Sequence, residues 1–181
     1  PKHFINAGVA EQNMIGVAAG LAKVGFLPVV YGLSSFVPIR VLEQIKMNLC
    51  YENLKCILIG DGAGVVYSHL GASHQSAEDI SCLRPLPNIQ IFSPTDEYEM
   101  SLCFSKALSY GGPSYIRMGK SDLGSIHERP LDFEVGDLIE VKRGQGRIGI
   151  IATGSMVLTG RQVISDHYPD ASLWSAPFIK P

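Results

Sequence analysis

Charged residues are scarce in this chain of 181 residues. They make up 18% of the sequence, against 46% for hydrophobic residues, and the formal net charge is −2. Because no run of Lys or Arg is present to attract phosphate groups, the charge gives no reason to expect nucleic acid as a partner. No apolar stretch reaches the roughly 18 residues that a membrane-spanning helix needs, so no membrane partner is expected. The apolar content instead predicts a sizeable buried core.

Cysteine is sparse and follows no metal-binding pattern. The cysteines are Cys50, Cys56, Cys82 and Cys103, and none forms a C-x-x-C pair or lies at zinc-finger spacing with a histidine. Their apolar neighbours favour buried, reduced thiols. Since reduced thiols are typical of the cytosol, we expect a cytoplasmic protein.

An alternation of apolar strands and amphipathic helices is what the sequence does contain. Helices are expected at residues 11–24, 38–51, 76–82 and 96–108, the last with Thr95 as N-cap, and strands at 28–33, 56–59, 89–92 and 114–117. Residues 60–74 are expected to form a long loop that contains several glycines. This alternation predicts the α/β class: a three-layer domain whose mainly parallel central sheet is flanked by helices.

The composition changes after residue 120. Residues 121–146 are polar and broken by glycine and proline, which favours a linker with one or two short strands. A strand at 147–152, a helix ending near 165 and a strand at 172–179 are expected to follow. A unit of this size buries too little surface to stand alone. We therefore expect a first domain at 1–120, a linker at 121–146 and an incomplete α/β unit at 147–181.

Two residues in the first part of the chain are candidates for chemistry. Glu11 falls in the first turn of an expected helix, where it either caps the helix together with Gly8 or shares a proton with a ligand nitrogen. Phe36 follows an expected strand, at the end of the sheet where α/β domains bind ligands. It is either an ordinary core residue or a ring that stacks on a flat heteroaromatic group.

The glycine-containing loop adds His69 and His74. Their spacing in a loop does not suit a metal pair, and no carboxylate or thiol completes a set. They are therefore either solvated side chains or, in one case, a hydrogen-bond donor or proton carrier that faces a substrate.

Several short segments gain specificity from their order along the chain. They are 7–14 (AGVAEQNM), 34–36 (SSF), 43–47 (EQIKM), 71–79 (GASHQSAED), 83–89 (LRPLPNI), 93–96 (SPTD) and 112–117 (GPSYIR). Together they resemble the pyrimidine-binding (Pyr) domain of the transketolase family and of the related 1-deoxyxylulose-5-phosphate synthases. Segments 150–155 (IIATGS) and 178–181 (FIKP) resemble the start of the transketolase C-terminal domain.

The resemblance implies a component of a thiamine-diphosphate-dependent transferase that moves a two-carbon ketol unit. By analogy, Glu11 contacts N1′ of the aminopyrimidine and promotes the tautomer that removes the thiazolium C2 proton. Phe36 would stack on the aminopyrimidine, and His74 would be a catalytic residue that faces the substrate. Arg117 would bind a sugar-phosphate substrate, although an ordinary ion pair is the alternative.

The resemblance also implies partners. In this family Mg²⁺ and the diphosphate are held mainly by a domain that these residues do not include, so we expect a diphosphate-binding domain or subunit as partner and no activity from this chain alone. A homodimer through the Pyr domain is expected as well. Because the chain opens at Pro1 without an initiator Met, we expect either a piece of a longer protein or the small subunit of a split transketolase.

One pattern superficially fits the Mg²⁺-diphosphate motif of thiamine enzymes. Residues 60–62 read GDG, and Asn88 follows at a compatible distance. Asn88, however, leads into an expected strand, and no second asparagine comes next. We interpret the match as chance and predict no metal ligands in this chain.

Two positions depart from the transketolase pattern and leave the substrates open. Leu70 stands where an aspartate usually contacts the acceptor hydroxyl, and Gly60 or Asp61 stands where a phosphate-binding histidine is usual. Alternatives are a 1-deoxyxylulose-5-phosphate-synthase-like enzyme and a 2-oxoacid dehydrogenase E1 beta-like subunit. The segment 74–79 argues against the second. Outside enzymes, a non-catalytic ligand-binding α/β module is the alternative, and the presence of Glu11 argues against it.

Overall fold

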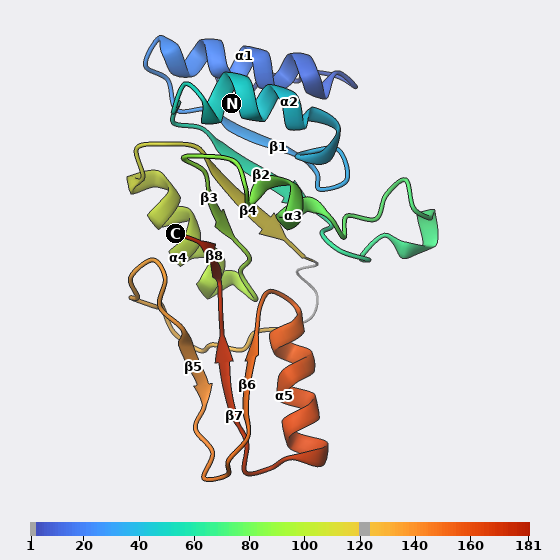
Figure 1. Cartoon of the computed structure of the whole chain (residues 1–181), viewed down its shortest axis with the longest axis vertical. Helices are drawn as coiled ribbons and strands as arrows, with labels where there is room; N and C mark the ends of the chain where they lie inside the picture. The colour runs from blue at the N-terminus through green and yellow to red at the C-terminus, as the bar shows by residue number, and fades with distance from the viewer. Residues whose placement is uncertain (1–2, 120–123) are drawn as a thin grey trace.

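A five-stranded sheet forms the centre of the computed structural model, which describes residues 3–119 and 124–181 (Figure 1). Its strands, in spatial order, are β1 (Val29–Leu33), β2 (Ile57–Asp61), β4 (Ser114–Met118), β3 (Gln90–Phe92) and β8 (Phe178–Lys180). The first four run parallel and β8 is antiparallel to β3. The predicted α/β class with a mainly parallel sheet is therefore confirmed. The expected domain boundary at 120/121 lies outside the described residues.

Helices cover both faces of this sheet. Helix α1 (Glu11–Lys23) and a helical segment at 39–50 lie on one face, and α4 (Glu97–Ser109) lies on the other (Figure 1). Residues 38–51 were predicted as one helix, but the segment changes type along its length. It consists of a 3-10 turn (Ile39–Val41), α2 (Leu42–Gln44) and a π-helix (Ile45–Cys50). A short helix, α3 (Asp79–Leu83), follows the long loop.

The helix starts differ from the predicted caps by one or two residues. Helix α1 begins at Glu11 with Ala10 at the N-cap position, and no side chain caps it. Gly8 has a positive φ of 66° and lies outside the helix. In α4 the N-cap is Asp96 rather than Thr95, and its carboxylate accepts hydrogen bonds from two backbone N–H groups of the first turn. The Glu11 carboxylate is thus not one half of a capping box.

A second, three-stranded sheet follows. It contains β5 (Ile139–Lys142), β7 (Ser172–Ser175) and β6 (Gly149–Ala152), and α5 (Met156–His167) packs beside it. The strand predicted at 172–179 is in fact divided between β7 and β8. Pro177 separates the two, and proline has no N–H to continue a ladder. The chain therefore leaves the second sheet and completes the first one.

Part of the predicted linker packs onto the first sheet. Ile139 is 1% exposed and belongs to a buried cluster with Phe92 and Ile116. Leu131, Phe133 and Val135 pack against the same cluster. Within the described residues this stretch is thus part of the core on the α4 side, and the division of the chain at 146/147 stays a prediction. None of the helices in the described ranges has both the length and the apolar character that crossing a membrane requires.

Candidate functional site

The carboxyl end of β1 leads into a tight turn that presents Phe36. The Ser34 N–H donates to the Asp61 carbonyl across the sheet (2.7 Å), and the Phe36 N–H donates back to the Leu33 carbonyl (2.8 Å). The hydroxyl oxygens of Ser34 and Ser35 are buried and have no hydrogen-bond partner within the described part of the chain. Buried polar groups without partners are uncommon and are typical of places where a ligand or water completes the bonding.

Arg40 joins this turn to the start of α1. Its Nη1 donates to Glu11 Oε2 over 3.0 Å, and its guanidinium carbon lies 4.0 Å from the centroid of the Phe36 ring. The Glu11 side chain is 14% exposed and that of Arg40 is 44% exposed. A carboxylate and an aromatic ring, separated in sequence, therefore hold one flat cationic group between them.

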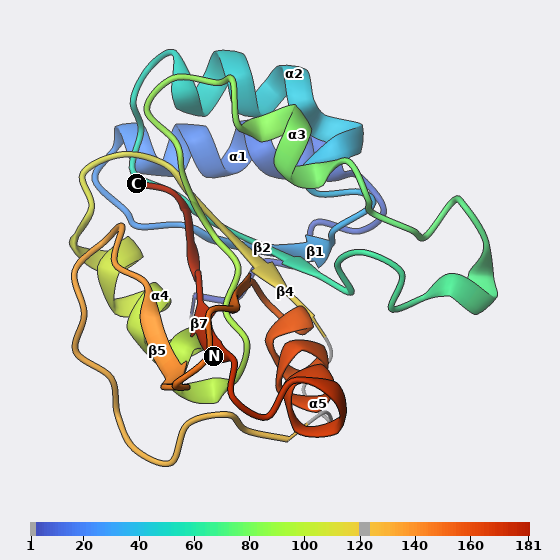
Figure 2. The same cartoon turned by 60° about the horizontal axis from the view of Figure 1, so that its bottom comes forward.

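His74 completes this group from the long loop. Its ring centroid lies 5.5 Å from that of Phe36 in an edge-to-face arrangement, and its Nδ1 lies 3.0 Å from Ser73 Oγ. The loop projects from the domain (Figure 2), but its base is closed by paired backbone hydrogen bonds between Gly64 and Ser76. The structure thus brings three of the predicted residues, Glu11, Phe36 and His74, into one chain of contacts through Arg40.

Arg117, the fourth predicted residue, lies in a separate cluster. Its Nε donates to Asp79 Oδ2 over 2.8 Å, and the Tyr115 hydroxyl donates to the same oxygen over 2.9 Å. Asp79 is fully buried. Burial and the neighbouring Asp79 raise the pKa of Tyr115 well above its ordinary value. Arg117 Nη2 also approaches the carbonyl of Ser76 (3.4 Å), which connects this cluster to the base of the His74 loop.

The GDG pattern does not bring its members together. Asp61 ends β2, whereas Asn88 precedes β3, and because the two strands run parallel these residues lie at opposite edges of the sheet. Asn88 donates its side-chain amide to the Cys50 carbonyl. Among the described residues no group of three or more His, Cys, Asp or Glu side chains is placed to hold a metal ion.

Of the two residues at the 60/61 departure from the transketolase pattern, Gly60 and Asp61, only Asp61 has a side chain. A Cβ at Gly60 would lie 2.3 Å from the Tyr115 hydroxyl, so this position takes no side chain. Asp61 Oδ2 accepts hydrogen bonds from Tyr31 (2.7 Å) and Tyr67 (3.5 Å). The bond to Asp61 and burial raise the pKa of Tyr31 to about 12. Where the resemblance implies a histidine, at position 60 or 61, the chain thus offers only a carboxylate, which two phenols hold.

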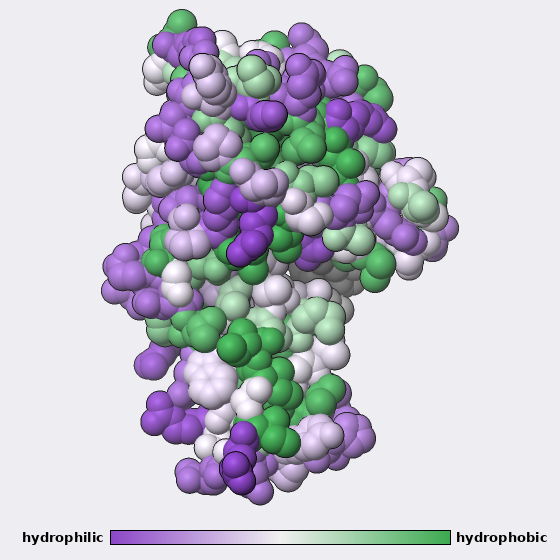
Figure 3. Space-filling view, viewed as in Figure 1, coloured by the Kyte–Doolittle hydropathy of each residue, from purple (hydrophilic) through white to green (hydrophobic). Residues whose placement is uncertain are grey.

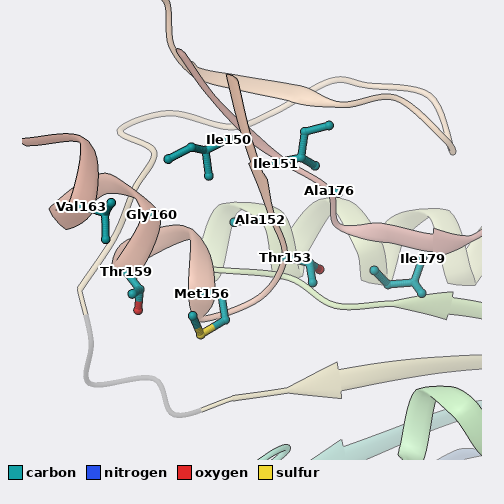
Figure 4. Close-up of a pocket in the computed structure, with 10 residues that line it drawn as sticks. All are labelled: Ile150, Ile151, Ala152, Thr153, Met156, Thr159, Gly160, Val163, Ala176 and Ile179. Carbon is teal, nitrogen blue, oxygen red and sulfur yellow. The ribbon is translucent and has the colours of Figure 1, made fainter. Parts of the chain in front are cut away.

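A groove lies apart from these residues, beside β6, α5 and the chain that enters β8. Its volume is about 510 Å³, and Figure 4 shows the residues that line it. Its lining residues are Ile150, Ile151, Ala152, Thr153, Met156, Thr159, Gly160, Val163, Ala176 and Ile179. In Figure 3 apolar residues gather over the region where β6 and α5 lie. None of the described residues that line the groove is ionisable, so these residues cannot perform acid–base chemistry.

Three of the four cysteines are unsuited to act as nucleophiles. All are free, and Cys50, Cys56 and Cys103 are buried. Burial raises the pKa of the Cys50 thiol to about 11 and that of Cys56 to about 12, so both are protonated near neutral pH.

Sequence reasoning missed two members of the site, Arg40 and Asp79. Arg40 is a cation inside an otherwise apolar stretch shortly after Phe36, and that isolated charge was a usable signal. Its pairing with Glu11, which is 29 residues away, depends on how α1 docks and was not predictable from spacing. Asp79 lies inside a recognised segment, but nothing local shows that it is buried against Arg117.

The carboxyl edge of a parallel sheet, with a shielded carboxylate, an aromatic ring and a histidine gathered beside it, defines a ligand-binding α/β domain. Over residues 1–125 the chain matches the family model described as "Transketolase, pyrimidine binding domain". The chain therefore belongs to the transketolase family and carries its pyrimidine-binding domain.

Relatives support the same assignment. One subunit of an apulose-4-phosphate transketolase of Actinobacillus succinogenes is 38% identical, covering 87% of this chain and 50% of that protein. A 1-deoxy-D-xylulose-5-phosphate synthase of Pelotomaculum thermopropionicum is 37% identical, covering 100% of this chain and 29% of that protein. A solved structure described as "Split gene transketolase, inactive beta4 tetramer" has a TM-score of 0.86 at 34% identity, covering 100% of this chain and 59% of that chain. The chain thus spans half or less of the length of both sequence relatives.

Proposed function

We propose that this chain is the pyrimidine-binding component of a transketolase-like enzyme that transfers a two-carbon ketol unit. When bound, thiamine diphosphate supplies the carbanion chemistry of this transfer. The observation that carries the proposal is the placement of Glu11 and Phe36 around one flat cationic N–H donor. The aminopyrimidine of the cofactor is also flat and carries nitrogen atoms at its edge, so these two residues fit it.

The roles of the residues follow from their chemistry. Glu11, shielded by the turn, would share a proton with N1′ of the aminopyrimidine, and the Phe36 ring would stack on it. His74, at the edge of Phe36, would move a proton to or from the substrate. Arg117 would bind a substrate phosphate with the guanidinium nitrogens that Asp79 leaves available.

A diphosphate-binding domain or subunit is the proposed partner, and it would supply most of the ligands for Mg²⁺. The Actinobacillus relative is named as one subunit of a transketolase, which supports a divided enzyme. This chain would then be inactive without that partner. The buried free cysteines support a cytoplasmic location.

A homodimer through the Pyr domain is also proposed, with α1 at the interface. Val17 is 42% exposed, and nothing lies within 4 Å of the positions where Gly16 and Gly20 would carry a Cβ. A helix face that is this smooth and partly apolar suits close packing against a second copy, with a total buried area above roughly 1,000 Å².

A second candidate activity exists, and it would change the class of substrate. Identity with a 1-deoxy-D-xylulose-5-phosphate synthase supports an activity of that type as the second candidate. Asp61 and Leu70 bear on this choice, since a carboxylate beside a bound phosphate is unfavourable. A sugar phosphate would therefore have to place its phosphate at the Arg117 guanidinium, and Arg117 lies one residue out of register with Asp61 on the adjacent strand β4.

Glu11→Gln tests the proposal in the enzyme assembled with its diphosphate-binding subunit. Glutamine keeps the size and a hydrogen bond but cannot take up a proton, so kcat should fall by about 10² to 10⁴-fold, with a smaller effect on substrate KM. C2-proton exchange of bound thiamine diphosphate, followed by NMR, should slow in parallel. Unchanged exchange together with a lower melting temperature would make Glu11 a structural residue and would refute the proposal.

A further inference from the structure

Arg40 occupies the space between the two side chains assigned to the aminopyrimidine. It extends from the 3-10 turn Ile39–Val41, forms an ion pair with Glu11 at 3.0 Å, and stacks its guanidinium 4.0 Å from the centroid of Phe36. Within residues 3–119 and 124–181 it has no other ion-pair partner by which it would be held in place. Its position therefore depends on the same two groups that the cofactor would use.

Both contacts conflict with a bound aminopyrimidine. The ion pair with the guanidinium engages Oε2 of Glu11 and stabilises the charged carboxylate, so it opposes the proton sharing with a ring nitrogen that the cofactor would require. The guanidinium also covers a face of Phe36, which the proposed ring stacking requires. The guanidinium and a bound aminopyrimidine would therefore compete for Glu11 and for the covered face of Phe36.

We propose that Arg40 is a latch that fills the aminopyrimidine site of the cofactor-free chain and withdraws when the cofactor enters. The inference rests on the proposed function, because it assumes that Glu11 and Phe36 receive the aminopyrimidine. Withdrawal is inexpensive, since the Arg40 side chain is 44% exposed and regains hydration as it leaves. When no cofactor is present, the latch gives Glu11 an ion-pair partner and Phe36 a cation–π contact.

Only molecules with an open latch can bind the cofactor. The apparent Kd therefore equals the intrinsic Kd divided by the fraction of molecules in which the latch is open. One partly exposed ion pair and one exposed cation–π contact keep such a latch closed in most molecules but not in all. Removing it should therefore tighten thiamine diphosphate binding by roughly fivefold to tenfold. Salt screens the ion pair, so the gain should shrink at high ionic strength.

The test measures thiamine diphosphate affinity by calorimetry, with Mg²⁺, in the chain assembled with its diphosphate-binding subunit. Arg40→Met keeps the length and the apolar contact with Phe36 while it removes the charge and the donors. It should lower Kd by roughly fivefold to tenfold, and the ratio of the two Kd values should fall in high salt. Arg40→Lys keeps the charge but not the flat stacking surface, so its Kd for thiamine diphosphate should lie between that of the parent and that of Arg40→Met.

A second readout follows Arg40 directly. The Nη1 protons of Arg40 should be protected from solvent exchange without cofactor, because Nη1 donates to Glu11, and should lose that protection when thiamine diphosphate binds. Weaker or unchanged binding in Arg40→Met, in a variant that melts as the parent does, would overturn the latch while leaving the proposed function intact. A parent complex that binds no thiamine diphosphate would overturn both.

Discussion

At the scale of single residues, the fully buried carboxylate of Asp79 binds two side chains of β4. The same Oδ2 accepts hydrogen bonds from Tyr115 and from the guanidinium of Arg117. Its Oδ1 is buried without a partner within the described residues. A buried charge is tolerated only when it is paired, so Asp79 and Arg117 depend on each other.

Asp79→Ala should therefore destabilise the chain by about 2–3 kcal/mol, because it leaves the Arg117 guanidinium and the Tyr115 hydroxyl without their acceptor. Asp79→Asn retains one acceptor oxygen and should cost less. The free energy of unfolding from urea titrations measures both. Tyr115→Phe is the matched control and removes a single hydrogen bond, for a loss of about 1 kcal/mol. Equal losses in Asp79→Ala and Tyr115→Phe would show that the pair with Arg117 contributes nothing.

The start of α4 shows how one helix end organises its surroundings at the scale of elements. Asp96 caps α4, and its second oxygen accepts the backbone N–H groups of Ile126 and His127. His127 Nε2 lies 2.9 Å from Oε1 of the fully buried Glu99. The helix start thus fastens the chain that follows β4 back onto the first domain.

This junction predicts a pH-dependent stability. Burial lowers the pKa of His127, but the hydrogen bond to Glu99 and the nearby carboxylates of Asp96 and Glu99 outweigh it, so the pKa lies above its ordinary value of 6.5. A raised folded-state pKa stabilises the fold fully below the unfolded-state pKa, and this contribution is lost as pH rises through the folded-state value.

Urea unfolding of the parent and of His127→Gln, measured at several pH values between about 5.5 and 8.5, tests this. The difference in unfolding free energy should be largest at the acid end and should shrink as the solution becomes alkaline. His3→Gln controls for the loss of an exposed histidine. A difference that does not change with pH would mean that the His127 charge does not contribute to stability.

Local periodicity predicted the types and order of the main elements, because apolar spacing is a property of each segment alone. Prediction from local periodicity failed where the structure depends on contacts between residues far apart in the sequence. The segment 39–50 changes helix type along its length, which its apolar spacing did not predict, and the last predicted strand divides at Pro177 because its end pairs with β3. The same holds for the site: Phe36 was expected at a strand end, whereas the contact of Arg40 with Glu11 needed the docked helix.

At the scale of the whole molecule, hydrogen bonds connect the two sheets at several points. The Ser93 N–H donates to the Pro177 carbonyl, the Gly154 N–H donates to the Ser93 carbonyl, and the Thr95 hydroxyl donates to the Gly154 carbonyl. Strand β8 then adds the second unit's chain to the first sheet. Because these bonds cross between the sheets, opening one unit removes partners from the other.

We therefore expect the whole chain to unfold in one transition. The single tryptophan, Trp174, lies in β7 and reports on the second sheet, while far-UV circular dichroism reports mainly on helices of both units. Urea midpoints from the two signals should coincide.

Gly154→Ala should lower both midpoints together, since Gly154 has a φ of 54° and an added Cβ would lie 2.8 Å from Ser93 Oγ. Gly8→Ala is the matched control, with a φ of 66° and nothing within 4 Å of its Cβ position, so it carries the backbone strain without the contact. If Gly154→Ala moved the Trp174 transition and left the circular dichroism midpoint in place, the units would be folding independently, and the return of β8 to the first sheet would not be coupling them.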